Sequence, residues 1–166
     1  MAAPLKVSFE HFLEKFPEIA LPVTLTDESH HHFGKYNDPL PLLMIEQFIV
    51  PYEENDPDDM TEYMACFRLS DPGDFHAVVY WRAALMDYHY VLATYSRRGM
   101  LIDSRVIAGT YSDGQKLTQS VATINEDLGI YVVTGQADAH RTMDYNASTS
   151  TSYRLELKED GTIENV

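Results

Sequence analysis

Residues 75–95, FHAVVYWRAALMDYHYVLATY, decide the fold, because two runs of β-branched and aromatic residues flank a short break at Met86 and Asp87. Such runs on either side of a short turn are typical of a β-hairpin. A turn near residues 84–87 gives the hairpin a face that carries the cross-strand pairs Trp81–Tyr90 and Val79–Leu92. We expect this face to lie in the core. The opposite face is also largely apolar and carries Val78, Tyr80, Val91 and Ala93, so cover is expected on both sides.

The chain after Glu62 repeats this pattern. Short apolar and aromatic runs are separated by turn sequences such as SDPGD at 70–74, TYSDG at 110–114 and KEDG at 158–161. These connections are too short to hold a crossover helix, so neighbouring strands are expected to be antiparallel. We therefore predict that residues 62–166 form a twisted antiparallel meander of about seven strands, which can curl on itself.

The first 61 residues have a different periodicity. One helical stripe consists of Phe9, Phe12, Leu13 and Phe16, with Ser8 placed to cap it and Pro17 to stop it. A short buried helix is expected at residues 41–49, where Pro41 fits the first turn, and a short strand at 21–25. The sequence thus predicts one domain, residues 1–166, with an α+β fold. Its helical and loop portion, 1–61, packs two helices on the β-meander of 62–166.

Net charge is the strongest global feature. The chain carries −14, and residues 1–62 hold 13 acidic but only 3 basic side chains. Such a field repels phosphate backbones and anionic lipid surfaces, so neither nucleic acid nor a membrane is an expected partner. It favours encounter with a basic protein partner. The sequence contains neither a secretion signal nor an apolar run of about 18 residues, so a cytoplasmic location is expected.

The acidic loop that follows residue 52 is the candidate partner-binding surface. Its carboxylates are Glu53, Glu54, Asp56, Asp58, Asp59 and Glu62. The loop lacks the glycine and the final carboxylate that an EF-hand calcium site requires at fixed positions. Clustered carboxylates are suited to Lys and Arg side chains on a second protein.

The triplet His30–His32 raises the question of a metal site. Adjacent side chains on a helix or strand diverge, and a structural zinc site needs a second pair of ligands at short spacing. Residues 27–29 can instead open a helical turn that carries the histidines. No metal, cofactor or catalytic residue is therefore predicted. A metal-dependent hydrolase would require His30 or His32 to approach one of His11, His76, His89 and His140.

Three functional hypotheses remain open. The leading one is a non-enzymatic acidic protein-binding module, of which a bacterial immunity or inhibitor protein is one concrete form. The alternative is a small-ligand-binding protein or enzyme with a pocket in the mouth of the curled sheet, lined by Tyr80, Trp81 and Tyr90. A ligand-sized cavity with convergent polar groups would favour this alternative. The polar connection at 135–152 is a further candidate binding loop. The metal-dependent hydrolase is the third hypothesis.

Overall fold

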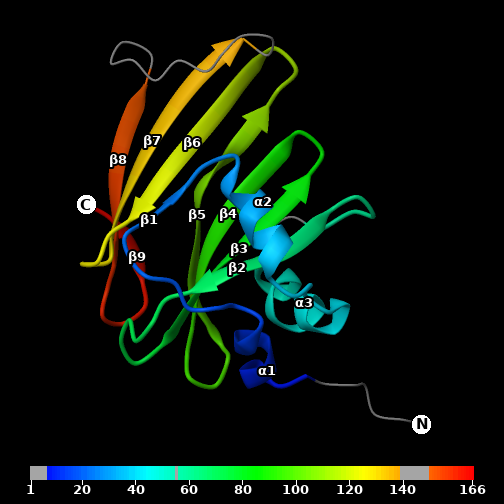
Figure 1. Cartoon of the computed structure of the whole chain (residues 1–166), viewed down its shortest axis with the longest axis vertical. Coiled ribbons are helices and arrows are strands. Elements are labelled where there is room, and N and C mark those ends of the chain that lie inside the picture. Colours follow the sequence, from blue (N-terminus) through cyan, green and yellow to red (C-terminus); the bar gives the residue numbers. More distant parts are fainter. Residues whose placement is uncertain (1–6, 55, 139–149) are drawn as a thin grey trace.

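A computed structural model describes residues 7–54, 56–138 and 150–166 of the chain. Strands β2 to β9 follow one another across a single large sheet, with β1 beside β6, and every neighbouring pair is antiparallel (Figure 1). The strands are β1 (Val23–Leu25), β2 (Glu62–Arg68), β3 (His76–Ala84), β4 (Asp87–Tyr95), β5 (Leu101–Ser112), β6 (Lys116–Ile124), β7 (Gly129–Asp138), β8 (Thr151–Leu157) and β9 (Ile163–Asn165). The predicted α+β fold with an antiparallel meander is confirmed. The described residues form nine strands rather than the predicted seven or so, and two of these, β1 and β9, are short.

Three short α-helices precede most of the sheet. They are α1 (Phe9–Glu14), α2 (Ser29–Tyr36) and α3 (Leu42–Phe48), and a 3-10 turn, η1 (Val50–Tyr52), follows α3. Ser8 caps α1 as predicted, since its side chain accepts a hydrogen bond from the His11 amide. Pro41 is the residue before α3 rather than part of its first turn. The histidine triplet lies on α2, a third helix beyond the two predicted. Within the described residues no helix is long and apolar enough to cross a membrane.

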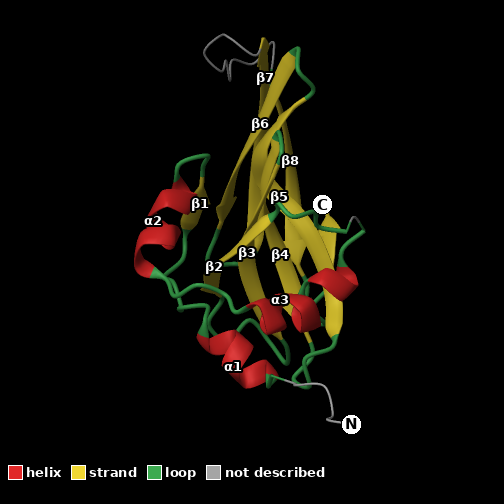
Figure 2. Cartoon of the chain, turned by 90° about the vertical axis from the view of Figure 1, so that its right-hand side faces the viewer, coloured by secondary structure: helices red, strands yellow, loops and turns green. Residues whose placement is uncertain are grey.

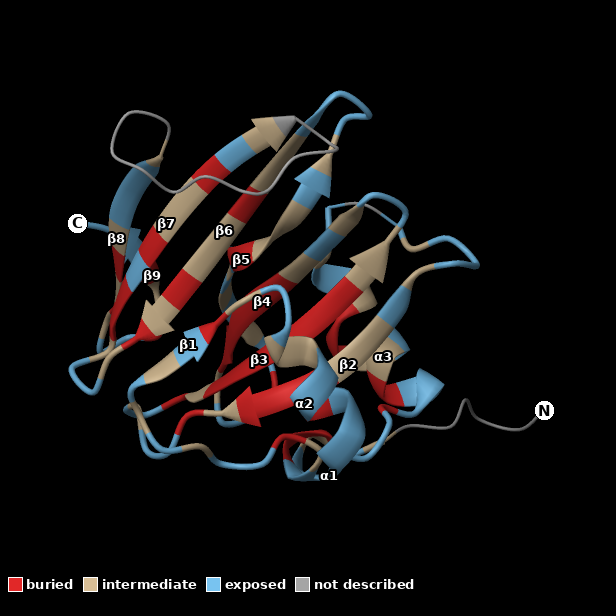
Figure 3. Ribbon diagram, turned by 45° about the horizontal axis from the view of Figure 1, so that its top comes forward, coloured by how far each residue is buried: buried red, intermediate tan, exposed pale blue. Residues whose placement is uncertain are grey.

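The central hairpin has the predicted register. Trp81 lies opposite Tyr90, and Val79 lies opposite Leu92. The face that carries these residues belongs to one core cluster, which also contains Phe33 of α2. The other face packs in a second cluster with residues of α1 and α3 and with Phe16, Leu40 and Ile49 beside these helices. Figure 2 shows α2 on one side of the sheet and α3 on the other, and Figure 3 shows that β3 and β4, between them, are largely buried.

The sheet curls, so that its last strand returns to its middle. The Asp103 carboxylate on β5 accepts a hydrogen bond from the Ile163 amide of β9 at 2.7 Å. In the turn before β9, the Gly161 carbonyl accepts one from the Thr94 hydroxyl of β4 at 2.6 Å. Strand β5 pairs with β6 only through residues 109–112, so its first half is free to meet β9 instead.

Candidate functional site

A cleft of about 430 Å³ opens on the face of the sheet that α3 covers. One wall is η1 and the two residues after it, and the floor is formed by β3, β4 and β5. Val91, Ala93 and Val106 make part of the floor apolar. Polar side chains gather toward the turn that joins β3 to β4. The volume is within the range typical of small-molecule sites, about 300 to 1,000 Å³.

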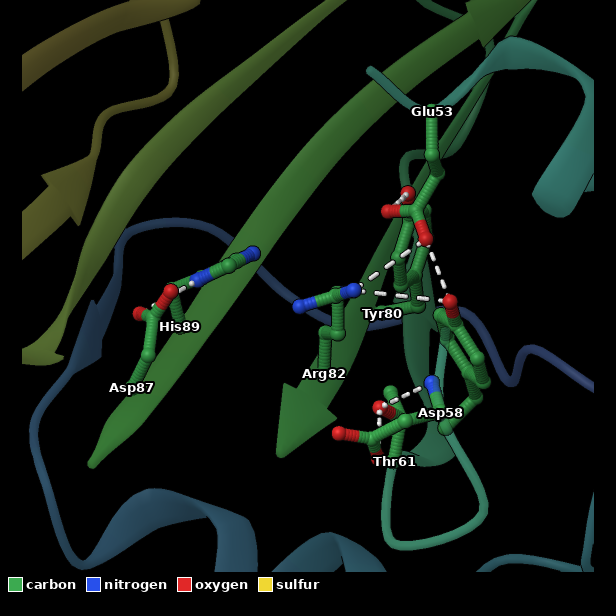
Figure 4. Close-up of polar contacts among 8 residues, drawn as sticks. Glu53, Asp58, Thr61, Tyr80, Arg82, Asp87 and His89 are labelled. Carbon is green, nitrogen blue, oxygen red and sulfur yellow. Dashed lines mark hydrogen bonds and ion pairs between the residues drawn. The ribbon is translucent and has the colours of Figure 1, made fainter. Parts of the chain in front are cut away.

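Arg82 and Glu53 form the centre of the polar end (Figure 4). The Glu53 carboxylate accepts hydrogen bonds from the Arg82 Nε at 3.2 Å, from the Tyr80 hydroxyl at 3.1 Å and from the Tyr63 hydroxyl. Only 9% of the Arg82 side chain and 11% of the Glu53 side chain is exposed. Sequence alternation places these groups together, because Tyr63 pairs with Arg82 across β2 and β3, and Tyr80 lies two residues before Arg82.

The environment keeps Arg82 charged and the two tyrosines protonated. Burial, together with the bond to Glu53, raises the pKa of Tyr63 to about 12. Burial raises the pKa of Tyr80 as well. For Arg82, burial acts to lower the pKa, but the Tyr63 hydroxyl and the Glu53 carboxylate outweigh it and the pKa is raised. Arg82 is therefore cationic at any physiological pH.

The Arg82 guanidinium is only partly used by this cluster. Its Nε is bound to Glu53 and lies 3.4 Å from the Tyr63 hydroxyl, and both of these bonds use Nε, so Nη1 and Nη2 make no hydrogen bond to the residues that the structure describes. Figure 4 shows the end of the guanidinium pointing away from Glu53 and toward His89. Two strong donors of a largely buried side chain thus face the cleft.

His89 stands opposite Arg82 in the hairpin, as the sequence register predicts. Its Nδ1 lies 3.0 Å from the carboxylate of Asp87, two residues earlier on the same face of β4. This contact fixes the ring orientation and leaves the second ring nitrogen on the side of Arg82 (Figure 4). The His89 side chain is 15% exposed and lines the cleft.

Arg105 of β5 borders the cleft, but its side chain points to the other face of the sheet, because Arg105 lies opposite Leu92 and adjacent to Val106. Its two terminal nitrogens donate to the Asn165 side chain at 2.8 Å and to the Ile163 carbonyl at 3.2 Å. The curl of the sheet therefore holds the Arg105 guanidinium at β9. Arg82 and His89 bring basic groups to the cleft of a strongly acidic chain, where they are accompanied by the carboxylates of Glu53, Glu54 and Asp87.

The predicted acidic surface is only partly offered to solvent. Glu54, Asp56, Asp59 and Glu62 are exposed and make no side-chain bond within the described part of the chain. Asp58 is also exposed, but its carboxylate accepts from the Met60 amide and the Thr61 hydroxyl, which lowers its pKa. Glu53 is turned inward to Arg82. The structure therefore leaves four of the six carboxylates free for a partner.

The aromatic set predicted to line a ligand pocket is divided between the two faces of the sheet. Trp81 and Tyr90 have ring centroids 4.7 Å apart and lie in the cluster under α2. Tyr80 lies in the cluster under α3 and borders the cleft. These three residues do not line one pocket, because adjacent residues on a strand point to opposite faces. The cleft of about 430 Å³ lies on the outer, helix-covered face of the curled sheet.

The histidine triplet is engaged in ring packing. The His30 ring lies parallel to Trp81, with centroids 4.3 Å apart, and the His31 ring is 4.0 Å from His30. Among the described residues, no group of three or more His, Cys, Asp or Glu side chains is placed to hold a metal ion. The candidate residue His140 and most of the candidate loop at 135–152 lie outside the described residues.

Sequence reasoning missed Arg82, Asp87 and His89 as a site. One signal was available, since Arg82 interrupts an apolar run and faces His89 in the predicted register. Comparison with known proteins adds no relative: the chain matches no protein-family model, and neither a curated protein nor a solved structure is similar to it.

Proposed function

We propose that the chain is a small-ligand-binding protein and that the cleft between η1 and strands β3 to β5 is its binding site. The observation that carries the proposal concerns Arg82. Its side chain is 9% exposed, and its terminal nitrogens are directed to the cleft without a hydrogen-bond partner among the described residues. Burial of an arginine is costly unless the charge is paired. The chain provides the pairing through Nε and keeps the rest of the guanidinium available.

A purely structural ion pair would be expected to use the guanidinium differently. Arginine and carboxylate pairs are frequently bidentate, with two parallel bonds that engage the terminal nitrogens. Here the Glu53 carboxylate is shared among Arg82, Tyr63 and Tyr80. The arrangement orients Arg82 rather than saturating it, which is the way that binding sites hold a ligand-contacting side chain.

The test compares two tryptophan variants in native mass spectrometry. The intact chain is incubated with a polar small-molecule extract of the cells that produce it, desalted and weighed. Ser104→Trp places a large side chain in the cleft without altering its charged groups, because Ser104 is exposed and borders the cleft. Ser152→Trp is the matched control, since Ser152 is an exposed serine on β8, away from the cleft.

A mass adduct on the wild-type chain and on Ser152→Trp, but absent from Ser104→Trp, would support the proposal. Two results would refute it: the absence of any adduct on the wild-type chain, or an adduct that all three proteins retain equally. Circular dichroism of each variant establishes that the sheet is intact before the comparison is made.

A basic protein partner is the second candidate function. Two observations favour it. Four carboxylates are exposed and make no side-chain bond to the described residues: Glu54, Asp56, Asp59 and Glu62. In addition, the sequence from 36 to 67 contains no Lys or Arg. A variant with these four residues changed to Gln or Asn removes the charge and leaves the internal Glu53 intact. A stoichiometric basic protein captured from lysate at low salt, and lost with the variant, would support this function. Equal capture by both proteins would argue against it.

A further inference from the structure

We infer that the ligand carries a carboxylate or phosphate group, which binds between the Arg82 terminal nitrogens and His89, and a small apolar body that lies on Val91 and Val106. This inference rests on the proposed function and specifies its chemistry. The shared chemistry is an anion attached to an apolar group of roughly one ring in size, in keeping with a cleft of about 430 Å³.

The terminal nitrogens of Arg82, which have no hydrogen-bond partner among the described residues, indicate that one end of the ligand is anionic. A guanidinium presents its donors in a planar fork that matches the oxygens of a carboxylate or phosphate, and such bonds are about twice as strong as neutral ones. The neighbouring Glu53 does not already fill this role, because its carboxylate lies on the Nε side. Because 91% of the Arg82 side chain is buried, an anion bound there is shielded from water on most sides.

His89 provides the second contact to the anion. Asp87 holds its Nδ1, so the ring nitrogen on the Arg82 side can donate to an anion when the imidazole is protonated. Asp87 on its own strand and Arg82 on β3 adjoin this imidazole, while Gly109 is its partner on β5 and adds no side chain. The carboxylates of Glu53 and Glu54 line the same cleft from the segment after η1. A bound anion would lie between two basic groups of opposite strands.

The floor of the cleft beside His89 indicates where the apolar part of the ligand would lie. Val91 is the next residue of β4 on this face, and Val106 of β5 lies opposite Val91. Val106 is 48% exposed although it lies in the middle of a strand, so its side chain is uncovered where it borders the cleft. A ligand body placed there would bury apolar surface that the chain leaves open.

Four probes of the same shape test the charge preference. Benzoate is anionic, benzamide is its neutral analogue, benzamidine is the cationic analogue, and phenyl phosphate carries a tetrahedral anion on the same ring. Each is titrated into the intact, isotope-labelled chain, and binding is followed by amide shifts of His89, Val91 and Val106. We expect saturable shifts for benzoate, for phenyl phosphate or for both, and affinity at least tenfold weaker for benzamide and benzamidine. The stronger of the two anions distinguishes a carboxylate from a phosphate ligand.

Arg82→Lys keeps the charge and the pairing to Glu53 but removes the planar fork, and should weaken anion binding at least tenfold. Arg97→Lys is the matched control, because Arg97 binds Asp74 through Nε in the same way on an exposed surface. Should Arg82→Lys fail to fold, His89→Gln serves in its place, with an expected loss of several-fold.

Benzamide binding as tightly as benzoate, or benzamidine binding best, would overturn the anionic inference. It would also be overturned if no probe bound saturably while the Ser104-sensitive adduct of the cell extract was still observed, and the proposed function would then stand. Absence of both the adduct and any probe binding would remove the two together.

Discussion

At the scale of single residues, His30 stacks on Trp81 on the α2 side of the sheet. Their rings are parallel to within 1°, and the His30 Nδ1 is buried without a hydrogen-bond partner in the described part of the chain. Burial, and then the neighbouring His31, lowers the pKa of His30 below its usual 6.5. The imidazole is therefore neutral at pH 7 and stacks on Trp81 as an uncharged ring.

Trp81 is the only tryptophan of the chain, so its fluorescence reports directly on this contact. We predict quenching as the pH falls, with a midpoint below 6.5, because protonation places a cation over the indole face. The same lowered pKa means that the unfolded chain binds this proton more tightly, so stability is lost as the pH falls from 6.5 through the folded-state pKa. His30→Gln should abolish the transition and His11→Gln should preserve it. A midpoint at or above 6.5 would contradict the buried, neutral imidazole.

Arg82 and Glu53 permit a prediction about stability that does not depend on any ligand. Arg82→Met leaves the Glu53 carboxylate buried without its counter-charge and should lower the free energy of unfolding by about 3–5 kcal/mol. Adding Glu53→Gln to this variant should recover a substantial part of the loss, since the buried group is then neutral and still bound by Tyr63 and Tyr80. Urea denaturation of the two single variants and the double variant measures the coupling. Additive losses would show that the two charges do not stabilise each other.

At the scale of elements, Gly109 allows β4 and β5 to approach closely beside the cleft. A Cβ at this position would lie 2.3 Å from the Tyr88 carbonyl oxygen and 2.7 Å from the His89 Cα. These atoms belong to the backbone of β4, which cannot move without displacing the Asp87 and His89 side chains. Gly109 is thus required for its lack of a side chain.

We predict that Gly109→Ala lowers the free energy of unfolding by about 3 kcal/mol, because the added methyl group forces β4 and β5 apart. Gly114→Ala is the matched control, since Gly114 also has a positive φ but an added Cβ there meets nothing within 4 Å. Its cost should be limited to the backbone strain, about 1–2 kcal/mol. Thermal unfolding of both variants makes the comparison. Equal losses would mean that backbone conformation alone explains the glycine at 109.

The sequence predicted the hairpin of β3 and β4 to the residue, because an alternation of period two around a short turn allows one register that buries Trp81 with Tyr90. It did not predict the cleft. The floor depends on an irregularity in the pairing of β4 with β5, between Tyr90 and Val91, and no residue type marks such a bulge in the sequence. The predicted pocket combined Tyr80 with Trp81, although adjacent residues on a strand point to opposite faces of the sheet.

At the scale of the whole molecule, the curl of the sheet depends on polar contacts between β5 and β9. Arg105 of β5 donates to Ile163 and Asn165 of β9, which come from the other end of the meander. The Asp103 carboxylate fixes the same two strands through the Ile163 amide. Such contacts between residues about 60 apart in sequence leave no local pattern, which explains why the curl was expected only in general terms from the sequence.

This dependence gives a prediction for Asp103→Ala. Removal of the carboxylate leaves the Ile163 amide without its acceptor and should cost about 1–3 kcal/mol of unfolding free energy. Hydrogen exchange at residues 161–165 should accelerate, while the central hairpin keeps its protection, because β9 opens locally before the core does. Asp59→Ala, at an exposed carboxylate that makes no side-chain bond among the described residues, should change neither quantity. Unchanged exchange at 161–165 in Asp103→Ala would show that β9 keeps its place on β5 without this carboxylate.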